Sequence, residues 1–446
     1  MNSKGIGQEL NRISEELTDI DGRLLELKKR RQELQSKKQQ LEQKLKLSTE
    51  SREVIKDFST EDFPWSPNVR HILKSTFIME NFRDYQLAVI NATLSNEDVI
   101  LIMSTGGGKS LCYQLPALVA QKGFTLVVSP LISLMQDQLL GLKRYGVHSA
   151  MLNQISSKEQ ISSIQDMMID AKSPLKVLFV TPEKLAKSKR FMARLEKSYT
   201  LGMLQRIAID EVHCCSQWGH DFRPDYKFLG ILRRQFPDNV PILGLTATAT
   251  RSVIDDVKNI LNIPAALTFK APFNRPNLIY EVSPKPTNSE EFFNILLRLL
   301  NGRFKDQSGI IYCFSRKESE EVASKLSSKS VKALSYHADL DPLVRSKVHE
   351  SWYSGACQVI VATVAFGMGI DKPDVRFVIH HSLAKSLENY YQESGRAGRD
   401  GGEAVCLLFY GFNDIFRQSS LVCTEKTGVD NLMVMLKFCH EKKLCR

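Results

Sequence analysis

Apolar residues recur at alternating spacings of three and four near the N-terminus, which is the repeat of a helix with one apolar seam. The seam residues are Leu10, Ile13, Leu17, Ile20, Leu24, Leu27, Leu34, Leu41 and Leu45. The same register places Arg31 and Lys38 on the seam, where charged side chains weaken a coiled coil but help to set its register. We predict a coiled-coil-like helix over residues 1–50 that self-associates through residues 10–45; the alternative is an amphipathic helix that lies on its own protein.

The pattern changes twice along the rest of the chain. Prolines and small polar residues interrupt the repeat at 51–67, which favours a linker. From residue 68, short apolar runs alternate with helix-compatible sequence: DVILIM (98–103), FTLVVS (124–129), LKVLFV (175–180), RIAID (206–210) and PILGLTA (241–247). After the proline-rich stretch 271–288 the runs are SGIIYCF (308–314), KALSYH (332–337), CQVIVAT (357–363), VRFVIHH (375–381) and AVCLLFY (404–410). This alternation predicts an α/β fold with two tandem parallel-sheet domains, 68–272 and 273–417, and a helical segment at 418–446.

Composition narrows the class of protein. The formal charge of +10 and the pI of about 9.0 favour a polyanionic partner such as nucleic acid, with an anionic membrane as the alternative. The sequence has no apolar run of about 18 residues and no signal-peptide pattern, so we expect a soluble intracellular protein with no membrane partner. Its nine cysteines lack C-x-x-C spacing, which argues against a disulfide framework.

A glycine-rich stretch, MSTGGGKS, follows the first apolar run of the first predicted domain. Between a strand and a helix, such a stretch can hold phosphates with its backbone N–H groups, while Lys109 reaches the β and γ phosphates and Ser110 ligates Mg²⁺. A flexible glycine turn is the alternative, because Met103 stands where this motif usually has its first glycine. We predict ATP binding by Met103, Ser104, Thr105, Gly106, Gly107, Gly108, Lys109 and Ser110.

Two adjacent carboxylates end a later apolar run. Asp210 and Glu211 follow RIAI, so they are expected at the carboxyl end of a strand. There Asp210 can reach Mg²⁺ and Glu211 can orient or deprotonate the attacking water. A helix N-cap is the alternative reading of the same pair.

The residues from Asp210 to His213, DEVH, resemble the DEAH-type box of superfamily 2 helicases, and residues 214–226 resemble the aromatic-rich loop of the RecQ helicase family. Further blocks of that family follow in order: FRDYQ (82–86), VVSPLISLMQDQ (127–138), LTATAT (245–250), IIYCFSRK (310–317), residues 359–380 and YYQESGRAGRDG (390–401). Within the family, the N-terminal segment and EDFPWS (61–66) are most similar to the short animal members. The resemblance implies two RecA-like domains, a variable residue at Met103, and an ATP-dependent 3′ to 5′ DNA helicase.

The resemblance also implies roles for four residues at the nucleotide. Gln86 would read adenine through its amide and Arg83 would stack on the base or brace the pocket, with a buried structural glutamine as the alternative. Arg396 and Arg399 lie three apart, so on a helix they would share a face toward the other domain. The resemblance makes them arginine fingers for the γ-phosphate, against the alternative of ordinary surface arginines.

The aromatic-rich loop suits single-stranded nucleic acid, because aromatic side chains stack on bases and a basic residue contacts phosphate. Its predicted contact residues are Trp218, His220, Phe222, Arg223 and Tyr226; a hydrophobic cluster is the alternative. Residues predicted to couple strand contact to hydrolysis are His213, Gln217, Thr246, Thr248, Gly367 and Asp371.

The C-terminus departs from the family pattern, in which a four-cysteine zinc module and a winged helix follow. Cys445 matches the first zinc ligand, and a single cysteine cannot form a tetrahedral site, so we expect no stable zinc here. We expect ATP and Mg²⁺ as cofactors, single-stranded and forked DNA as partners, nuclear localisation, and DNA-stimulated ATP hydrolysis with weak unwinding. An RNA helicase and a non-enzymatic module switched by ATP are the competing functions.

Overall fold

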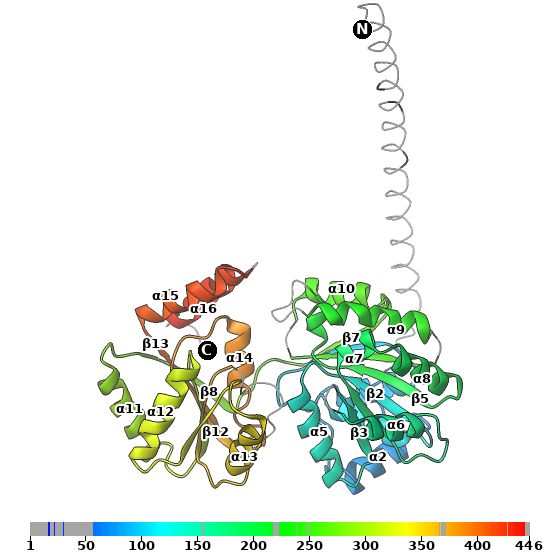
Figure 1. Ribbon diagram of the computed structural model, residues 1–446, viewed down its shortest axis with the longest axis horizontal. Coiled ribbons are helices and arrows are strands. Elements are labelled where there is room, and N and C mark those ends of the chain that lie inside the picture. Colours follow the sequence, from blue (N-terminus) through cyan, green and yellow to red (C-terminus); the bar gives the residue numbers. More distant parts are fainter. Residues whose placement is uncertain are drawn as a thin grey trace, which may run out of the picture. The chain divides into compact units, whose positions relative to one another are not determined.

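The computed structural model describes residues 57–153, 156–216, 223–237, 239–247, 249–364, 366, 372–425 and 427–441, together with Leu17, Gly22 and Arg30. Nearly all of the apolar seam at 10–45 lies outside these residues, so self-association stays a prediction. The chain divides into two units, Met1–Asp57 and Phe58–Arg446. Both sheets belong to the second unit, which is described by itself below (Figure 1).

The first α/β domain is built on a seven-stranded sheet in the order β3-β4-β2-β5-β6-β1-β7, with every pair parallel. Its strands are β1 (Val99–Ile102), β2 (Phe124–Val128), β3 (Ser149–Leu152), β4 (Val177–Val180), β5 (Leu204–Ile209), β6 (Ile242–Thr246) and β7 (Leu267–Lys270). Its helices are α2 (Ser66–Ser75), α3 (Gln86–Leu94), α4 (Leu111–Val119), α5 (Ile132–Arg144), α6 (Lys158–Met167), α7 (Pro182–Lys187), α8 (Lys189–Thr200), α9 (Gly230–Gln235) and α10 (Arg251–Ile260), with short 3-10 turns η1 (Val212–Cys215) and η2 (Pro224–Leu229).

Strand β1 shows why these sequences form a sheet covered on both faces. Ile100 and Ile102 pack into the core shared with α8 and α10, whereas Val99 and Leu101 pack into the core shared with α3 and α4. Successive side chains of a strand point to opposite faces, so a strand buried on both faces must be apolar throughout. The carboxyl ends of the central strands then emerge together at one edge of the sheet.

The second α/β domain contains a six-stranded parallel sheet in the order β10-β11-β9-β12-β13-β8. Its strands are β8 (Leu278–Pro284), β9 (Ser308–Tyr312), β10 (Ala333–Tyr336), β11 (Val359–Ala362), β12 (Val375–His380) and β13 (Ala404–Tyr410). Its helices are α11 (Ser289–Asn301), α12 (Arg316–Ser328), α13 (Pro342–Tyr353), α14 (Leu387–Ser394), α15 (Phe412–Val422) and α16 (Gly428–His440). Helices α11 and α12 cover one face and α13 the other, while α15 and α16 pack on α14 and Leu408 (Figure 1).

The prediction of two parallel-sheet domains is confirmed, and each of the ten apolar runs contains a strand. Three strands were not predicted. Strands β3 and β7 lie at sheet edges and are only partly buried, so their sequences lack a continuous apolar run. Strand β8 falls inside the proline-rich stretch 271–288, which we interpreted as the boundary between the domains.

Residues 57–67, the described part of the predicted linker at 51–67, pack against the first domain. Phe63 stacks between Phe58 and Trp65, with ring centroids 6.1 and 5.2 Å apart. The indole Nε1 of Trp65 donates a 2.9 Å hydrogen bond to Oδ1 of Asn91 in α3. These aromatic residues therefore belong to the first domain. Within the described part of the chain, no helix has both the length and the apolar character needed to cross a membrane.

Candidate active site

The segment Met103–Ser110, called the phosphate loop below, connects β1 to α4 as the sequence predicts. Gly106 and Gly108 adopt φ angles of +77° and +89°, in the left-handed region that favours glycine. A side chain at Gly108 would also collide with the Gln86 amide, and one at Gly107 would collide with Met103. Met103 itself is buried and its backbone follows the strand, so the glycines needed for close turns are the three after it.

Lys109 is held at the centre of this loop. Its Nζ donates to the backbone oxygens of Met103 and Ser104, at 3.0 and 3.4 Å. Burial lowers the pKa of Lys109, while the carboxylates of Glu211 and Asp210 act to raise it. The structure therefore brings the lysine and both predicted carboxylates into one electrostatic cluster.

Asp210 and Glu211 emerge from the carboxyl end of β5, as predicted. The Asp210 amide donates to Val128 at 2.8 Å, which continues the sheet, and its Oδ1 accepts from the Glu211 amide at 3.0 Å. Glu211 adopts a left-handed φ of +48°, which turns the chain sharply after the strand. Burial and the neighbouring Glu211 carboxylate raise the pKa of Asp210. The two carboxylates thus concentrate more negative charge than Lys109 alone balances.

His213 contacts both the carboxylates and the next strand. Its Nδ1 lies 2.9 Å from Oγ1 of Thr246 at the end of β6 and 3.3 Å from Oε2 of Glu211. This geometry suits the predicted coupling role of His213 and Thr246. Gln217, Thr248, Gly367 and Asp371, the other predicted coupling residues, lie outside the described residues.

Gln86 and Arg83 lie against the phosphate loop. The Gln86 side chain is buried, donates from Nε2 to Gly108 O at 3.0 Å and accepts from the Arg83 amide at 2.8 Å. Arg83 donates to the Gly106 carbonyl and, at 3.4 Å, to the Arg399 carbonyl. Both side chains support the loop, and adenine reading by Gln86 stays a prediction.

The structure corrects one residue of the aromatic-rich loop. Trp218, His220 and Phe222 lie outside the described residues, and Arg223 donates to the Pro130 carbonyl at 3.1 Å. Tyr226 is fully buried and its hydroxyl donates to the Asp210 backbone oxygen at 2.9 Å. A base cannot stack on a ring inside the core, so the prediction of strand contact by Tyr226 is wrong. Tyr226 instead holds the backbone of Asp210, which is predicted to be catalytic.

The two arginines do not share a helix face. Helix α14 ends at Ser394, and both arginines lie in the following segment, residues 395–403, called the arginine loop below. Arg399 reaches the phosphate loop, since a Cβ atom on Gly106 would lie 2.9 Å from Arg399 Cγ. Arg396 is buried, and its charge acts on Tyr312 of the second sheet. The structure therefore places Arg399 beside the predicted phosphate site.

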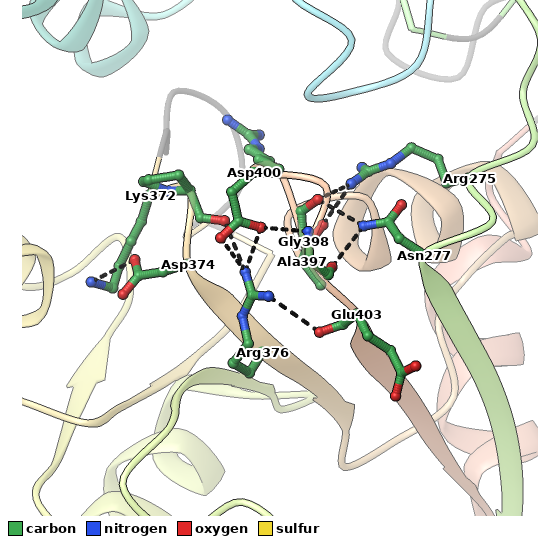
Figure 2. Close-up of polar contacts among 12 residues, drawn as sticks. Arg275, Asn277, Lys372, Asp374, Arg376, Ala397, Gly398, Asp400 and Glu403 are labelled. Atoms are coloured by element: carbon green, nitrogen blue, oxygen red, sulfur yellow. Dashed lines mark hydrogen bonds and ion pairs between the residues drawn. The ribbon is translucent and has the colours of Figure 1, made fainter.

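Side chains far away in the sequence hold the arginine loop, and none of them was predicted (Figure 2). Arg275 and Asn277, in the segment between the domains, donate to carbonyls of Gly395, Ala397, Gly398 and Gly402. Arg376 of β12 donates from Nη2 to both carboxylate oxygens of Asp400, at 2.6 and 2.7 Å, and from Nη1 to the Glu403 carbonyl. In the sequence, the only sign of these contacts is that an arginine and an asparagine flank Pro276.

A second polar cluster has a different character. Ligand atoms of Cys313, Glu318 and His381 lie within 4.8 Å of one another, a spacing that could hold a metal ion. However, Glu318 already accepts from Arg417 at 3.2 Å and from the Phe314 amide at 2.8 Å. A divalent cation would have to displace an arginine, so we interpret the cluster as a structural charge network. Cys445, the predicted zinc ligand, lies outside the described residues.

Comparisons with known proteins agree with this arrangement. Residues 83–257 match the DEAD/DEAH box helicase family and residues 291–401 match the helicase conserved C-terminal domain. The ATP-dependent DNA helicase Q1 of Rattus norvegicus is 58% identical over 389 residues, which cover 87% of this chain and 62% of that protein. The putative ATP-dependent DNA helicase Q1 of Caenorhabditis elegans is 56% identical, covering 90% of this chain and 64% of that protein. The chain thus spans somewhat less than two thirds of these relatives.

A solved structure shares the fold at low sequence identity. The S. cerevisiae protein Dbp5, bound to RNA and ADP BeF3, superposes with a TM-score of 0.62 and 19% identity, covering 86% of this chain and 100% of that one. Both sheets therefore have the RecA-like helicase fold. With the matched helicase domains and the identity to several animal Q1 helicases, the chain belongs to the RecQ family of helicases.

Proposed function

We propose that the chain is an ATP-dependent DNA helicase of RecQ type that couples ATP hydrolysis to 3′ to 5′ movement on single-stranded DNA and to duplex unwinding. One observation carries this proposal: the charges of Asp210, Glu211 and Arg399 all act on Lys109 of the phosphate loop, and Arg399 comes from the second domain to lie beside Gly106. A site completed by an arginine from a second RecA-like domain can sense domain closure, which is how hydrolysis becomes movement.

The residues of the cluster fit ATP and Mg²⁺. Ser110 and Asp210 offer the oxygen ligands that Mg²⁺ prefers. Burial and the neighbouring Glu211 carboxylate raise the pKa of Asp210, and a bound dication would oppose both effects by favouring the ionised carboxylate. When bound, Mg²⁺ would neutralise charge on the phosphates. Lys109 and Arg399 would stabilise the charge of the transferred γ-phosphoryl group, and Glu211 would orient water or accept its proton.

The polynucleotide partner is proposed from charge and from relatives. The chain carries a formal charge of +10, and the two relatives described above are named as DNA helicases. Positive charge favours any nucleic acid, so the preference for DNA over RNA rests on those relatives and on the aromatic-rich loop that follows the carboxylates.

ATP hydrolysis measured alone, with single-stranded DNA and with single-stranded RNA tests the proposal. We expect stimulation by DNA, with Lys109→Ala inactive under all three conditions. Stimulation by RNA alone would favour an RNA helicase, and no stimulation by either would favour an ATP-switched binding module. A forked duplex with a 3′ or a 5′ tail then tests unwinding and its polarity.

Two further predictions concern the whole chain. We propose that residues 10–45 mediate self-association and that the protein acts in the nucleus. A Leu24→Glu substitution would place a charge on the apolar seam, so it should lower the native mass of an oligomer without changing ATP hydrolysis. An unchanged native mass would argue for an amphipathic helix that does not self-associate.

A further inference from the structure

Arg275 binds the arginine loop through its guanidinium group. One nitrogen, Nη1, donates to the Gly395 carbonyl at 3.1 Å, and the other, Nη2, donates to the carbonyls of Ala397 and Gly398 at 2.9 and 2.6 Å (Figure 2). These carbonyls lie on both sides of Arg396 and immediately before Arg399. Arg275 therefore fixes the backbone from which both arginines project.

The same guanidinium also touches the phosphate loop. Its Nη1 donates to the Thr105 carbonyl at 3.3 Å. The two loops are close at this point, because a Cβ atom on Gly395 would lie 3.3 Å from Thr105 Cβ. Nearby, the Tyr391 hydroxyl donates to the Phe273 carbonyl at 2.8 Å, which ties the segment carrying Arg275 to α14. One side chain between the domains thus bridges the loops that supply Lys109 and Arg399.

The chemistry of these contacts requires arginine. Among the described residues, all four oxygens that Arg275 contacts are backbone carbonyls, so hydrogen bonds and not an ion pair hold the group. Burial lowers the pKa of Arg275, which reflects the cost of removing its charge from water. A guanidinium presents five donors in a rigid plane, whereas an ammonium presents three on a flexible stem. Lysine could not span the same acceptors.

Asn277, two residues after Arg275, also binds the arginine loop. Its Nδ2 donates to the carbonyls of Gly398 and Gly402 at 2.8 and 2.9 Å (Figure 2). Gly398 has a φ of +57°, and a Cβ atom there would lie 2.5 Å from Asn277 Nδ2. The loop can therefore approach Asn277 only with glycine at this position. Arg275 and Asn277 together fix the turn that precedes Arg399.

We propose that Arg275 is a positioning residue for ATP hydrolysis: it holds the arginine loop against the phosphate loop so that Arg399 stays beside Gly106. The inference rests on the proposed ATPase function and deepens it. It requires that the effect of Arg275 on hydrolysis pass through Arg399, because three of its four hydrogen bonds go to the backbone that carries Arg399. The fourth, to the Thr105 carbonyl, holds that backbone against the phosphate loop.

A double-mutant cycle tests that requirement. Arg275→Ala should lower kcat for DNA-stimulated ATP hydrolysis roughly 10- to 100-fold with less than about threefold change in KM, and Arg275→Lys should not restore it. Arg275→Ala combined with Arg399→Ala should be no slower than Arg399→Ala alone. Losses that multiply in the double variant, or full activity with Arg275→Lys, would overturn the proposal.

Hydrogen exchange tests whether Arg275 holds the arginine loop in place, without relying on ATP hydrolysis. We call this contact the clamp. The Gly398 amide donates to the Val375 carbonyl at 2.9 Å, so a firmly held loop protects it. Arg275→Ala should accelerate exchange of the Gly398 and Gly402 amides by at least about tenfold at unchanged unfolding temperature. The control is Arg303→Ala, which removes an exposed bidentate pair with Glu281 at 2.8 Å in the same domain. Equal exchange in both variants would refute the clamp even if the chain hydrolyses ATP; no hydrolysis by the unaltered chain would refute the proposed function instead.

Discussion

The phosphate loop and the arginine loop supply opposite sides of the proposed site, but they are held in different ways. The phosphate loop is shaped by its own residues: Gly106 and Gly108 adopt left-handed conformations, and Lys109 binds carbonyls five and six positions before it. The arginine loop depends on remote side chains, with Arg275 bonding to Gly398 across 123 positions of the sequence. One loop is encoded locally and the other by the tertiary fold.

This difference bears on how the site can work. A loop shaped by its own backbone keeps its form whenever β1 and α4 are in place, so it suits binding. A loop held by side chains from the segment between the domains can respond when that segment moves. We infer that binding resides in the phosphate loop and that sensitivity to domain position resides in the arginine loop.

Removing the charged side chain of Lys109 should have the largest effect on ATP hydrolysis. Lys109→Ala takes away the positive charge that faces the predicted γ-phosphate, so DNA-stimulated kcat should fall about 100- to 1000-fold or more. The fold should survive, because Lys109 only bonds carbonyls of its own loop. Lys122→Ala, an exposed lysine just before β2, is the matched control and should retain full activity. Comparable losses in both variants would remove the reason to place catalysis at this loop.

A substitution at one glycine should distort the phosphate loop, because the loop is shaped by its own residues. Gly108→Ala forces a left-handed residue to carry a side chain, costing about 1 kcal/mol, and drives that side chain onto Gln86. We expect kcat/KM for ATP to fall at least about tenfold. Gly146→Ala has a similar φ of +70° but open space around its Cβ atom, so it should cost stability only. Steady-state kinetics and thermal unfolding of the two variants test this prediction. Equal kcat/KM values for Gly108→Ala and Gly146→Ala would contradict it.

Loosening the far side of the arginine loop should have a smaller effect. Arg376→Ala removes the pair with Asp400, whose side chain is 39% exposed, so about 0.5 to 1 kcal/mol of stability should be lost. Because this pair lies beyond Arg399, kcat should fall only about two- to fivefold. Chemical denaturation and ATPase assays at low and high salt would check this, since screening should shrink the difference. A loss larger than that of Arg275→Ala would reverse the proposed order of the two contacts.

The charge network at His381 predicts a modest pH dependence of stability. Burial lowers the pKa of His381 from 6.5 to about 4; Glu318 opposes the shift, and Lys285 and Arg417 add to it. The unfolded chain therefore binds a proton as the pH falls below 6.5 while the folded chain does not, so stability is lost between pH 6.5 and 4. Between pH 7 and pH 5 the loss should be on the order of 1 to 2 kcal/mol.

Thermal unfolding across this pH range provides the measurement. His381→Asn should flatten the profile relative to the unaltered chain, whereas His148→Asn, which replaces an exposed histidine of the first domain, should leave it unchanged. If the unaltered chain and His381→Asn lose stability in parallel, another group controls the acid response.

The contrast between the two loops also explains what the sequence could predict. The phosphate loop, the carboxylates after β5 and the ten predicted strands are contiguous patterns, so each could be recognised alone. Strands β3 and β7 were missed because edge strands bury only part of their surface. Arg275 and Asn277 were missed because nothing near them in the sequence indicates which carbonyls they bind.

Two incorrect expectations have related causes. Tyr226 was assigned to nucleic acid because it lies in an aromatic-rich loop, but composition does not show which ring the fold buries. Arg396 and Arg399 were placed on one helix face from their spacing alone. The helix ends at Ser394 and the left-handed Gly398 turns the chain between them, so the two residues do not share a helix face.

The measurement that tests the central claim most directly compares Arg399→Ala with Arg396→Ala in DNA-stimulated ATP hydrolysis. If Arg399 completes the site at Gly106, its loss should lower kcat about a thousandfold while leaving the unfolding temperature unchanged. Arg396→Ala, which removes a buried side chain near Tyr312, should lower the unfolding temperature as well. An Arg399→Ala variant that retains the kcat of the unaltered chain would contradict the assignment of the active site across the two domains.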